Sequence, residues 1–435
     1  MSAPVRWTGP VSALDPEGLA SLLARGQAGP GKQVELRSQV ASIVAEVRTR
    51  GDAALRDLAR RLDRVSLDAL EVPREAIRSA LDRQPPALRR AMERSARNVA
   101  RVHSALLPRA TWVEVEPGVV VERRPDPLGR VGVYAPGGRA AYPSSVLMGA
   151  VPARVAGVRE IVLCSPPGPS GLPSDVVLAA AAVAEVDRVF ALGGAGAIAA
   201  LAHGTGTVPA VDRIVGPGNA WVAEAKRQVS SFVPIDAPAG PSELLVLLDA
   251  AADLEAVARE LLAQAEHDPE AVVVAVALDE RTARRLIERL AALAPAAERA
   301  DIIRQALSVR GAVLVAGTLE EAVTFAERWA PEHLMLALEG APELARRIRN
   351  AGTIFIGTSS SGAFGDYLTG ANHVLPTAGA ARAWSGLSTL DFVRWTTVQT
   401  VSREAAASLA GDTDAFATAE GLHAHAAAAR AWRKG

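Results

Sequence analysis

Residues 131–164 read VGVYAPGGRAAYPSSVLMGAVPARVAGVREIVLC and place a segment of mixed small and apolar residues between two short apolar runs. The runs Val131–Tyr134 and Glu160–Cys164 are rich in β-branched residues, which favours strands. Between them, Ser144–Ala156 has the length and composition of a helix. A strand, a helix and a second strand in this order predict a βαβ unit, in which the two strands are parallel and the helix covers one face of the sheet.

The same alternation continues through most of the chain that follows. Two more strands of the first sheet are expected at Asp187–Leu192 and Arg213–Val215, with helices at Ser174–Glu185, Ala195–His203 and Asn219–Gln228. A second set of strands is expected at Glu243–Leu248, Ala271–Val276, Ala312–Val315, Leu334–Leu338 and Thr353–Ile356. With 435 residues, 49% of them hydrophobic, the chain exceeds what one core usually supports. We therefore predict an α/β protein with two Rossmann-like parallel-sheet domains.

The segments outside the two sheets complete the predicted domain organisation. Residues 1–110 are expected to form a helical N-terminal segment and residues 111–127 a hairpin around Pro117-Gly118. The first Rossmann-like domain is predicted to span residues 128–238 and the second residues 239–380, because the Pro- and Gly-rich run 238–241 separates the two sets of strands. Residues 381–435 are predicted to be a helical tail that ends in the Ala-rich segment Ala415–Trp432.

Composition argues against several classes of function. A formal net charge of −1 gives no reason to expect nucleic acid or an acidic membrane surface as a partner. The single cysteine, Cys164, excludes a disulfide or a thiolate metal site within one chain, and we expect it to be buried at a strand end. The N-terminus has no basic region followed by an apolar stretch, and no long apolar window occurs, so a cytoplasmic location is expected.

The segment from Gly352 to Leu390 is too long for an ordinary connection. After the apolar run Thr353–Ile356 it is dominated by Gly, Ser, Thr, Ala and Pro around Asp366 and His373. Loops of this length in a compact domain are usually functional. We expect this loop to form the rim of an active site, to which it contributes the carboxylate of Asp366 and the imidazole of His373.

Three glycine-containing turns follow predicted strands of the first domain. Gly194-Ala-Gly196-Ala-Ile-Ala199 has the G-x-G-x-x-A pattern that brings a pyrophosphate to a helix N-terminus. The acidic residue that confirms such a pattern should end the next strand, but Asp212 precedes that strand, so a plain glycine-rich turn is the alternative. The turns after Tyr134 and at Gly216-Pro-Gly-Asn219 are expected at the same edge of the sheet. Together the three turns favour a ligand that carries phosphate.

Candidate metal ligands lie in the second half of the chain. Gln264 and His267, at positions i and i+3, are expected on one face of a helix that Asp268-Pro269 ends. With Asp366 and a C-terminal histidine they would form a site of nitrogen and oxygen ligands that suits Zn²⁺ or, less well, Mn²⁺ or Co²⁺. A histidine that merely ends the helix is the alternative.

Glu332 and His333 place a carboxylate and an imidazole in the turn before the strand Leu334–Leu338. Two adjacent groups do not easily share one proton path, so the pair suits two separate proton transfers. The alternative is a solvated turn without a catalytic role.

Several longer motifs are similar to those of L-histidinol dehydrogenases. They are Gly216-Pro-Gly-Asn219-Ala-x-Val-x-Glu-Ala-Lys-Arg-Gln-Val229, Pro238-Ala-Gly-Pro-Ser242-Glu243, Gln264-Ala-Glu-His267, Pro331-Glu-His333, Gly365-Asp-Tyr and Asn372-His-Val-Leu-Pro-Thr377. The resemblance extends from about Val40 to the C-terminus. It implies a zinc- and NAD-dependent enzyme of histidine biosynthesis, with one Zn²⁺ in each subunit, that oxidises L-histidinol to L-histidine through a bound aldehyde.

The resemblance also implies roles for individual residues. Zinc would be bound by Gln264, His267, Asp366 and His425, and the match of Leu422-His-Ala-His425 to the terminal motif of the family selects His425 rather than His423. Substrate would be contacted by these zinc ligands and by Ser242, His333, His373 and Glu420. NAD would be contacted by Tyr134 and Asn219. Glu332 and His333 would be the catalytic residues.

The resemblance further implies a homodimer in which the C-terminal tail completes the partner's site, so Glu420 and His425 are expected to act in the other subunit. As a hypothesis, His333 removes the alcohol proton in the first oxidation and Glu332 activates water for the second. One position departs from the family pattern, because Gly196 stands where the family usually has Gln. We expect this departure to weaken NAD binding without abolishing activity.

Other functions remain open at the level of the sequence. A related enzyme would oxidise a different small alcohol, such as a sulfonated diol, although His373, Glu420 and the Glu332-His333 pair favour histidinol. A zinc hydrolase would use Glu332 to activate metal-bound water and would move no hydride. A metal-binding regulator would catalyse nothing. An absorbance change that depends on NAD separates these possibilities.

Overall fold

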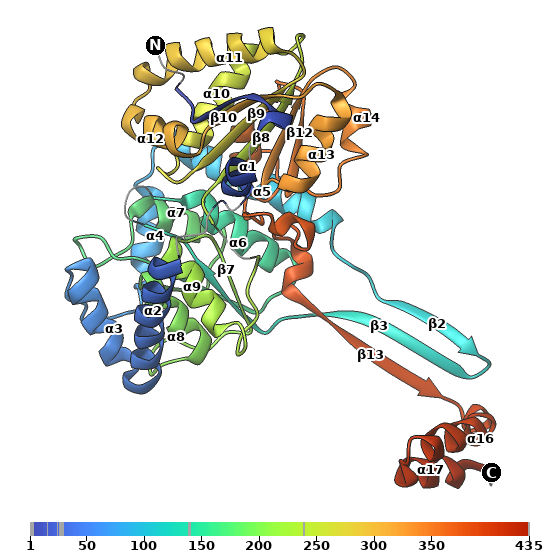
Figure 1. Ribbon diagram of the computed structural model, residues 1–435. Helices are drawn as coiled ribbons and strands as arrows, with labels where there is room; N and C mark the ends of the chain where they lie inside the picture. The colour runs from blue at the N-terminus through green and yellow to red at the C-terminus, as the bar shows by residue number, and fades with distance from the viewer. Residues whose placement is uncertain are drawn as a thin grey trace.

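The computed structural model describes residues 4–14, 16–23, 25, 30–137, 141–237 and 240–433. Two parallel sheets with helices on their faces form the two halves of the body, and an arm of strands and two helices extends away from it (Figure 1). This arrangement confirms the predicted α/β class with two parallel-sheet domains. The domain bounds stay a prediction, and residues 238 and 239 at the expected boundary lie outside the described residues.

The first sheet has four parallel strands in the order β6-β5-β4-β7. They are β4 (Arg130–Tyr134), β5 (Glu160–Ser165), β6 (Arg188–Ala191) and β7 (Arg213–Val215). Each strand is followed by one helix, and these helices are α6 (Pro143–Val155), α7 (Asp175–Val183), α8 (Gly194–His203) and α9 (Ala220–Val229). All the strands and helices predicted for this half are confirmed. Cys164 is fully buried in β5, as expected, and burial raises the pKa of its thiol.

The second sheet has six parallel strands in the order β1-β10-β9-β8-β11-β12. The five predicted strands are confirmed as β8 (Glu243–Leu248), β9 (Val272–Ala277), β10 (Ala312–Val315), β11 (His333–Ala337) and β12 (Thr353–Ile356). Its helices are α10 (Leu254–Ala265), α11 (Glu280–Leu293), α12 (Ala300–Arg310), α13 (Leu319–Trp329) and α14 (Ala341–Ala345). The edge strand β1 (Trp7–Pro10) was not predicted, and it joins the N-terminus of the chain to this sheet by pairing with β10.

Most of the N-terminal helices pack onto the first half of the body, but the first of them packs onto the second half, where its Leu22 belongs to a buried cluster of the second sheet. They are α1 (Pro16–Leu23), α2 (Pro30–Arg50), α3 (Asp52–Leu58), α4 (Arg74–Asp82) and α5 (Pro86–Ala105), with the π-helical turn η2 (Ala59–Asp63) after α3. Apolar residues of α2 to α5, among them Val40, Leu55 and Val99, belong to the same buried cluster as the strands of the first sheet. Within the described residues, no helix is both long enough and apolar enough to cross a membrane.

The arm contains an antiparallel sheet in the order β13-β3-β2. Its strands are β2 (Thr111–Glu116), β3 (Val119–Pro127) and β13 (Val393–Val401), and the helices α16 (Arg403–Ala419) and α17 (His423–Arg430) lie at its far end (Figure 1). The predicted hairpin is confirmed. The prediction of a helical tail over residues 381–435 is wrong in part, because β13 pairs with β3 over its whole length before α16 begins.

Candidate active site

The glycine-containing turns of the first sheet meet at the carboxyl ends of its strands. The hydroxyl of Tyr134, at the end of β4, accepts a hydrogen bond of 3.1 Å from the N–H of Gly194. Burial raises the pKa of Tyr134 to about 12, so the side chain stays a neutral hydroxyl. Gly216 has a φ of +117°, and a Cβ there would lie 2.1 Å from the carbonyl oxygen of Tyr134. Only glycine fits this turn, which lies where open α/β sheets bind ligands.

Asn219 is the N-cap of α9. Its Oδ1 accepts hydrogen bonds from the N–H groups of Trp221 at 3.0 Å and Val222 at 3.2 Å. This helix end carries partial positive charge, which suits a phosphate group. Because the cap uses the oxygen, the amide nitrogen is the part of Asn219 suited to contact a ligand. The NAD contacts of Tyr134 and Asn219 stay predictions.

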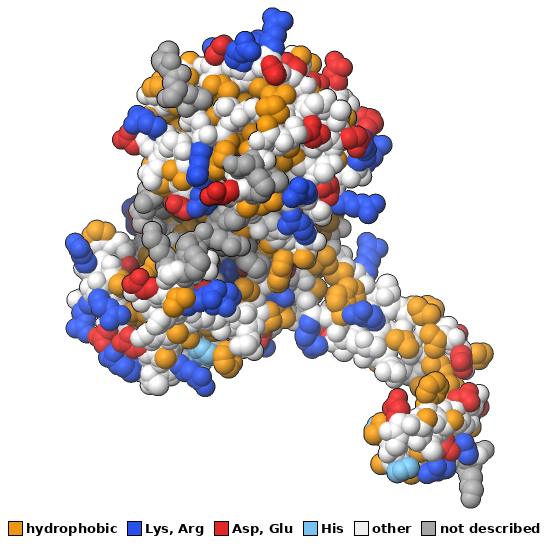
Figure 2. Space-filling model, viewed as in Figure 1, with side chains coloured by type: hydrophobic (Ala, Val, Ile, Leu, Met, Phe, Trp, Pro, Cys, Tyr) orange, Lys and Arg blue, Asp and Glu red, His pale blue; other side chains and the backbone are white. Residues whose placement is uncertain are grey.

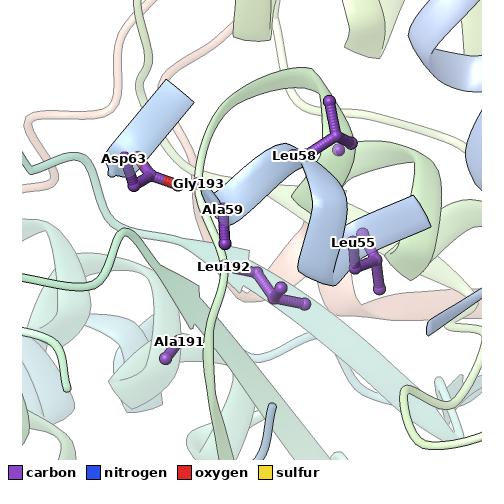
Figure 3. A pocket seen from close by; sticks show the side chains of 8 residues that line it. Leu55, Leu58, Ala59, Asp63, Ala191, Leu192 and Gly193 are labelled. Atoms are coloured by element: carbon purple, nitrogen blue, oxygen red, sulfur yellow. The ribbon is translucent and has the colours of Figure 1, made fainter. Parts of the chain in front are cut away.

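A small cavity lies beside the turn after β6 (Figure 3). Its lining residues come from α3, η2, the end of β6, the turn that follows it and α8, and they are Leu55, Leu58, Ala59, Asp63, Ala191, Leu192, Gly193 and Gly196. A Cβ at Gly196 would approach Cδ1 of Leu58 to 2.9 Å. Leu58 therefore occupies the space that a longer side chain at position 196 would need first. Burial raises the pKa of Asp63, the one acidic residue of the lining.

The loop that follows β12 contacts both halves of the body, and its predicted place at the rim of an active site stays a prediction. Asn372 donates through Nδ2 to the carbonyl of Met148 in α6 at 2.8 Å. On the other side, the N–H of Ala378 donates to Oε1 of Glu243, the first residue of β8, at 2.6 Å. The short helix α15 (Gly362–Tyr367) lies within this loop and carries Asp366.

His373 connects this loop to the first half of the body. Its Nδ1 donates to the backbone carbonyl of Asp366 at 2.9 Å, and its Nε2 is 3.4 Å from Oγ of Ser145 in α6. With Nδ1 carrying the proton, Nε2 accepts from the serine hydroxyl. Burial lowers the pKa of His373, which favours this neutral form of the ring.

Glu332 and His333 are buried, each with 6% of its surface exposed, so the alternative of a solvated turn is wrong. Oε2 of Glu332 is 3.5 Å from Nδ1 of His333, and that nitrogen also donates to the carbonyl of Glu243 at 3.0 Å. Nε2 of His333 is 3.9 Å from Oδ1 of Asp366. One imidazole is thus placed between two carboxylates that come from different elements of the fold.

The acidic neighbours control the protonation of His333. Burial alone would lower the pKa of the ring, but the carboxylates of Glu332 and Asp366 and the carbonyl of Glu243 raise it to about 9. A cation bound close to Asp366 would oppose this effect, because it would offset the negative charge that favours the imidazolium.

The candidate ligands Gln264 and His267 lie at the end of α10. The helix ends at Ala265, so the prediction that His267 lies on the helix is wrong; it follows the last turn. Oε2 of Glu260, one turn before Gln264, accepts a hydrogen bond of 2.9 Å from the N–H of Gly362, the first residue of α15. This contact ties the end of α10 to the helix that carries Asp366.

Ser242 lies directly before β8, beside the strand that Glu332 and His333 begin. The carbonyl of Ser242 accepts a hydrogen bond of 3.0 Å from the N–H of Val272, which fixes the start of β8 against β9. In the parallel pair β8 and β11, His333 is in register with Leu244. Ser242 and the acid–base pair are therefore at the amino ends of neighbouring strands, and their proposed roles in binding and catalysis stay predictions.

Glu420 and His425 lie apart from the other candidate residues. Both are exposed at the far end of the arm, where Glu420 ends α16 and His425 belongs to α17 (Figure 1). Within the described part of the chain, no group of three His, Cys, Asp or Glu side chains is arranged to hold a metal ion. One chain thus brings together Glu332, His333, Asp366 and His373 but does not bring Glu420 and His425 to them.

Two buried charged residues of this region were not predicted from the sequence. Glu243 accepts and donates hydrogen bonds with the Glu332 segment, and Arg25 forms an ion pair with Glu243 at 2.8 Å. Glu243 ends the motif Pro238-Ala-Gly-Pro-Ser242-Glu243, whose local pattern does not indicate a buried ion pair. Arg25 comes from the N-terminal segment and has no local sequence signal for a place in the site.

The chain as a whole is similar to known proteins. A sequence profile of histidinol dehydrogenases matches residues 28–433. Histidinol dehydrogenase of Natronomonas pharaonis is 48% identical over 417 residues, which cover 96% of this chain and 97% of that protein. The enzyme of Bordetella parapertussis is 46% identical over 418 residues, with 95% of this chain and 94% of that protein covered.

A solved structure agrees with these sequence matches. The crystal structure of histidinol dehydrogenase from Elizabethkingia anophelis superposes with a TM-score of 0.92 at 32% sequence identity. The superposition covers 100% of this chain and 99% of that one. The arm is therefore included in the similarity, and the resemblance inferred from the motifs is confirmed.

Proposed function

Because the chain belongs to the histidinol dehydrogenase family and is an oxidoreductase, we propose that it oxidises L-histidinol to L-histidine in two NAD-linked steps at a zinc site shared between two subunits. The observation that carries this proposal is the buried Glu332-His333 pair beside Asp366. An alcohol oxidation followed by an aldehyde oxidation requires two proton acceptors, and the pair supplies them at one place. The cytoplasmic location expected from the sequence is kept as part of the proposal.

The residues of the body fit a zinc ion. Gln264, His267 and Asp366 offer oxygen and nitrogen donors, which is a ligand set that zinc accepts in catalytic sites. The hydrogen bond between Glu260 and Gly362 holds their two elements together. When bound, zinc would hold and polarise the polar groups of the substrate and so fix its orientation. The fourth protein ligand, His425, would come from the arm of the partner.

The turns of the first sheet fit a dinucleotide. Tyr134, Gly194, Gly216 and Asn219 lie where a pyrophosphate is usually bound in such sheets, and the helix ends of α8 and α9 favour its charge. When bound, NAD would accept one hydride from the substrate carbon, and a second NAD would replace the NADH formed before the second step. His373 and Ser145 join this half of the body to the loop of Asp366, which supports a cofactor position near the acid–base pair.

The proton transfers are assigned to this chain's own residues. In the first step, His333 takes the proton of the substrate hydroxyl, for which its ring must be neutral. In the second step, the carboxylate of Glu332 takes a proton from the water that adds to the aldehyde. Both side chains are buried, so we expect bulk water to have little access to the bound aldehyde between the two oxidations.

The arm supports the proposed dimer. Large apolar side chains are exposed along its sheet and helices (Figure 2), and they are Trp112, Val113, Val115, Trp395, Val401, Phe416, Leu422 and Trp432. So many exposed apolar groups on one extended element are typical of a surface that another protein covers. In a dimer the arm would lie against the partner, and Glu420 and His425 would complete the partner's site.

Counting the NADH formed from L-histidinol tests the proposed function. We expect two NADH for each histidinol consumed, because the alcohol and the aldehyde are oxidised in turn. Treatment with a chelator should abolish the reaction and added Zn²⁺ should restore it, with the metal content followed by mass spectrometry. A product of one NADH, or none from histidinol with zinc present, would favour a relative that oxidises another alcohol.

Gly196 gives a second test, directed at the cofactor. A Gln at this position would regain a neutral hydrogen bond to NAD of about 0.5–1.5 kcal/mol, which corresponds to a KM for NAD lowered by about two- to tenfold. Because Leu58 is 2.9 Å from the position of the new Cβ, we expect the full effect only in the double variant Gly196→Gln, Leu58→Ala. Leu58→Ala alone is the control, and a double variant with the control's KM would contradict the expectation.

A further inference from the structure

Two reciprocal hydrogen bonds join Glu243 and Glu332, each from the backbone N–H of one residue to the side-chain carboxylate of the other. The N–H of Glu243 donates to Oε2 of Glu332 at 2.8 Å, and the N–H of Glu332 donates to Oε2 of Glu243 at 3.4 Å. The carbonyl of Glu243 also accepts the hydrogen bond from Nδ1 of His333. One residue at the start of β8 therefore fixes the side chains of both proposed catalytic residues.

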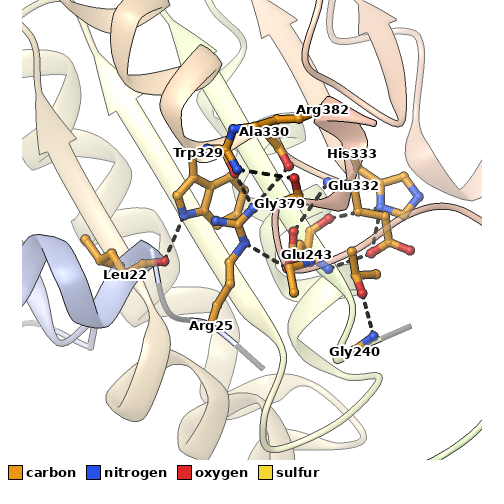
Figure 4. A network of polar contacts seen from close by, with 12 residues as sticks. Leu22, Arg25, Gly240, Glu243, Trp329, Ala330, Glu332, His333, Gly379 and Arg382 are labelled. Atoms are coloured by element: carbon orange, nitrogen blue, oxygen red, sulfur yellow. Dashed lines mark hydrogen bonds and ion pairs between the residues drawn. The ribbon is translucent and has the colours of Figure 1, made fainter. Parts of the chain in front are cut away.

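Arg25 reaches this pair from the N-terminal segment (Figure 4). Its Nε lies 2.8 Å from Oε1 of Glu243, and both side chains are almost completely buried. The guanidinium lies 4.0 Å from the ring centroid of Trp329 and donates to the carbonyls of Trp329 and Ala330. The indole N–H of Trp329 donates in turn to the carbonyl of Leu22, which anchors the segment. The arginine is thus held in one orientation by the end of α13.

The contacts of Glu243 require its ionised form. Oε1 faces Arg25 and the N–H of Ala378, while Oε2 faces the N–H of Glu332. A proton on either oxygen would point a donor at another donor and break one contact. Burial and the charge of Glu332 raise the pKa of Glu243, whereas Arg25 lowers it, and the outcome is about 7. The network is therefore sensitive to the loss of the arginine's charge.

We propose that Arg25 is a positioning residue for the reaction. It keeps Glu243 ionised and aligned, and Glu243 in turn holds Glu332 and His333 in the orientation that proton transfer requires. The inference rests on the proposed function and deepens it. Arg25 lies before residues 28–433, the region that the family profile matches. The other charged or titratable groups around the network are Glu332, directly before β11, His333, the first residue of β11, and Arg382 from the loop, whose positive charge repels that of Arg25.

Three variants of the intact dimeric enzyme test this role. For Arg25→Met we expect kcat to fall by about 10- to 100-fold, because a small misplacement of catalytic groups has effects of this size, while KM for histidinol stays nearly unchanged. The acidic limb of the kcat profile should move to higher pH, since Glu243 loses the charge that lowers its pKa. Arg25→Lys should restore the position of the limb and part of kcat. Arg310→Met, which removes a 2.6 Å ion pair with Glu270 in the same half of the body, is the matched control.

The experiment distinguishes failure of the positioning role of Arg25 from failure of the proposed function. Unchanged kcat and pH profile in Arg25→Met, or an equal loss in the Lys variant with an unmoved acidic limb, would overturn the positioning role. If the parent enzyme does not oxidise histidinol, the proposed function fails, and hydrogen exchange of residues 330–335 decides the inference instead. Faster exchange there in Arg25→Met but not in Arg310→Met supports it, and equal exchange overturns it. Arg25→Gln replaces the Met variant if that protein does not fold.

Discussion

Glu332→Gln is expected to leave the first oxidation largely intact and to slow the second by about 10²- to 10⁴-fold, the usual contribution of a general base. The amide of Gln cannot take the proton of the water that attacks the aldehyde. The first step should lose less, because His333 is present, although it no longer has a carboxylate 3.5 Å from its Nδ1. In a single turnover with excess NAD, the variant should form one NADH rapidly and the second only slowly.

The control for this experiment is Glu343→Gln, which removes an exposed carboxylate of α14. It should form both NADH at the rate of the parent enzyme. Supplying the aldehyde directly isolates the second step, where the defect of Glu332→Gln should remain in full. Equal loss of both steps would show that the two residues act as one unit and would refute the division of roles.

A mixture of two inactive variants is expected to regain activity. His267→Ala damages the body half of the zinc site, and His425→Ala damages the half that the arm would supply. Each variant alone should be inactive, because every site in its dimer lacks a ligand. When the two chains are co-expressed in equal amounts, half of the dimers are mixed, and each mixed dimer has one intact site. The preparation should therefore reach about a quarter of the parent activity.

The same experiment has a clear opposite outcome. If the arm served its own chain, each subunit in a mixed dimer would still carry one damaged ligand, and the mixture would remain inactive. Pairing two variants on the same side, His267→Ala with Asp366→Ala, is the control, because no combination of these chains contains an intact body half. Zinc content of the separated mixed dimer provides a reading that does not depend on turnover.

Much of the fold is predictable because its strands are buried and locally encoded. The runs at β4, β5 and β8 are rich in Val, Ile and Leu, and each is followed by a helix. β1 was missed because Trp7–Pro10 is short, contains Gly and Pro, and becomes a strand only by joining the edge of a sheet formed much later in the chain. β13 was missed for a different reason. Its Val, Thr and Trp residues favour a strand, but the Ala-rich segments that follow it indicate helices, and the prediction extended these helices over β13.

The residues of the candidate site were also predictable only in part. Glu332, His333, Asp366 and His373 stand in motifs with unusual composition, and the structure brings them together. The residues that hold them in place could not be found, because the contact between Arg25 and Glu243 joins two segments that are far apart in sequence. A sequence pattern reports local geometry, whereas the partner of a buried charge is set by how the whole chain packs.

The arm's sheet has a consequence for the order of synthesis. Its central strand, β3, precedes the first parallel sheet in the chain, but its partner β13 follows the second. A hairpin of β2 and β3 alone is marginally stable in water. While the chain emerges from the ribosome, this hairpin must wait until both halves of the body have been made before its third strand arrives. The surface proposed to form the dimer is therefore completed last, after the body residues of the sites that it would serve.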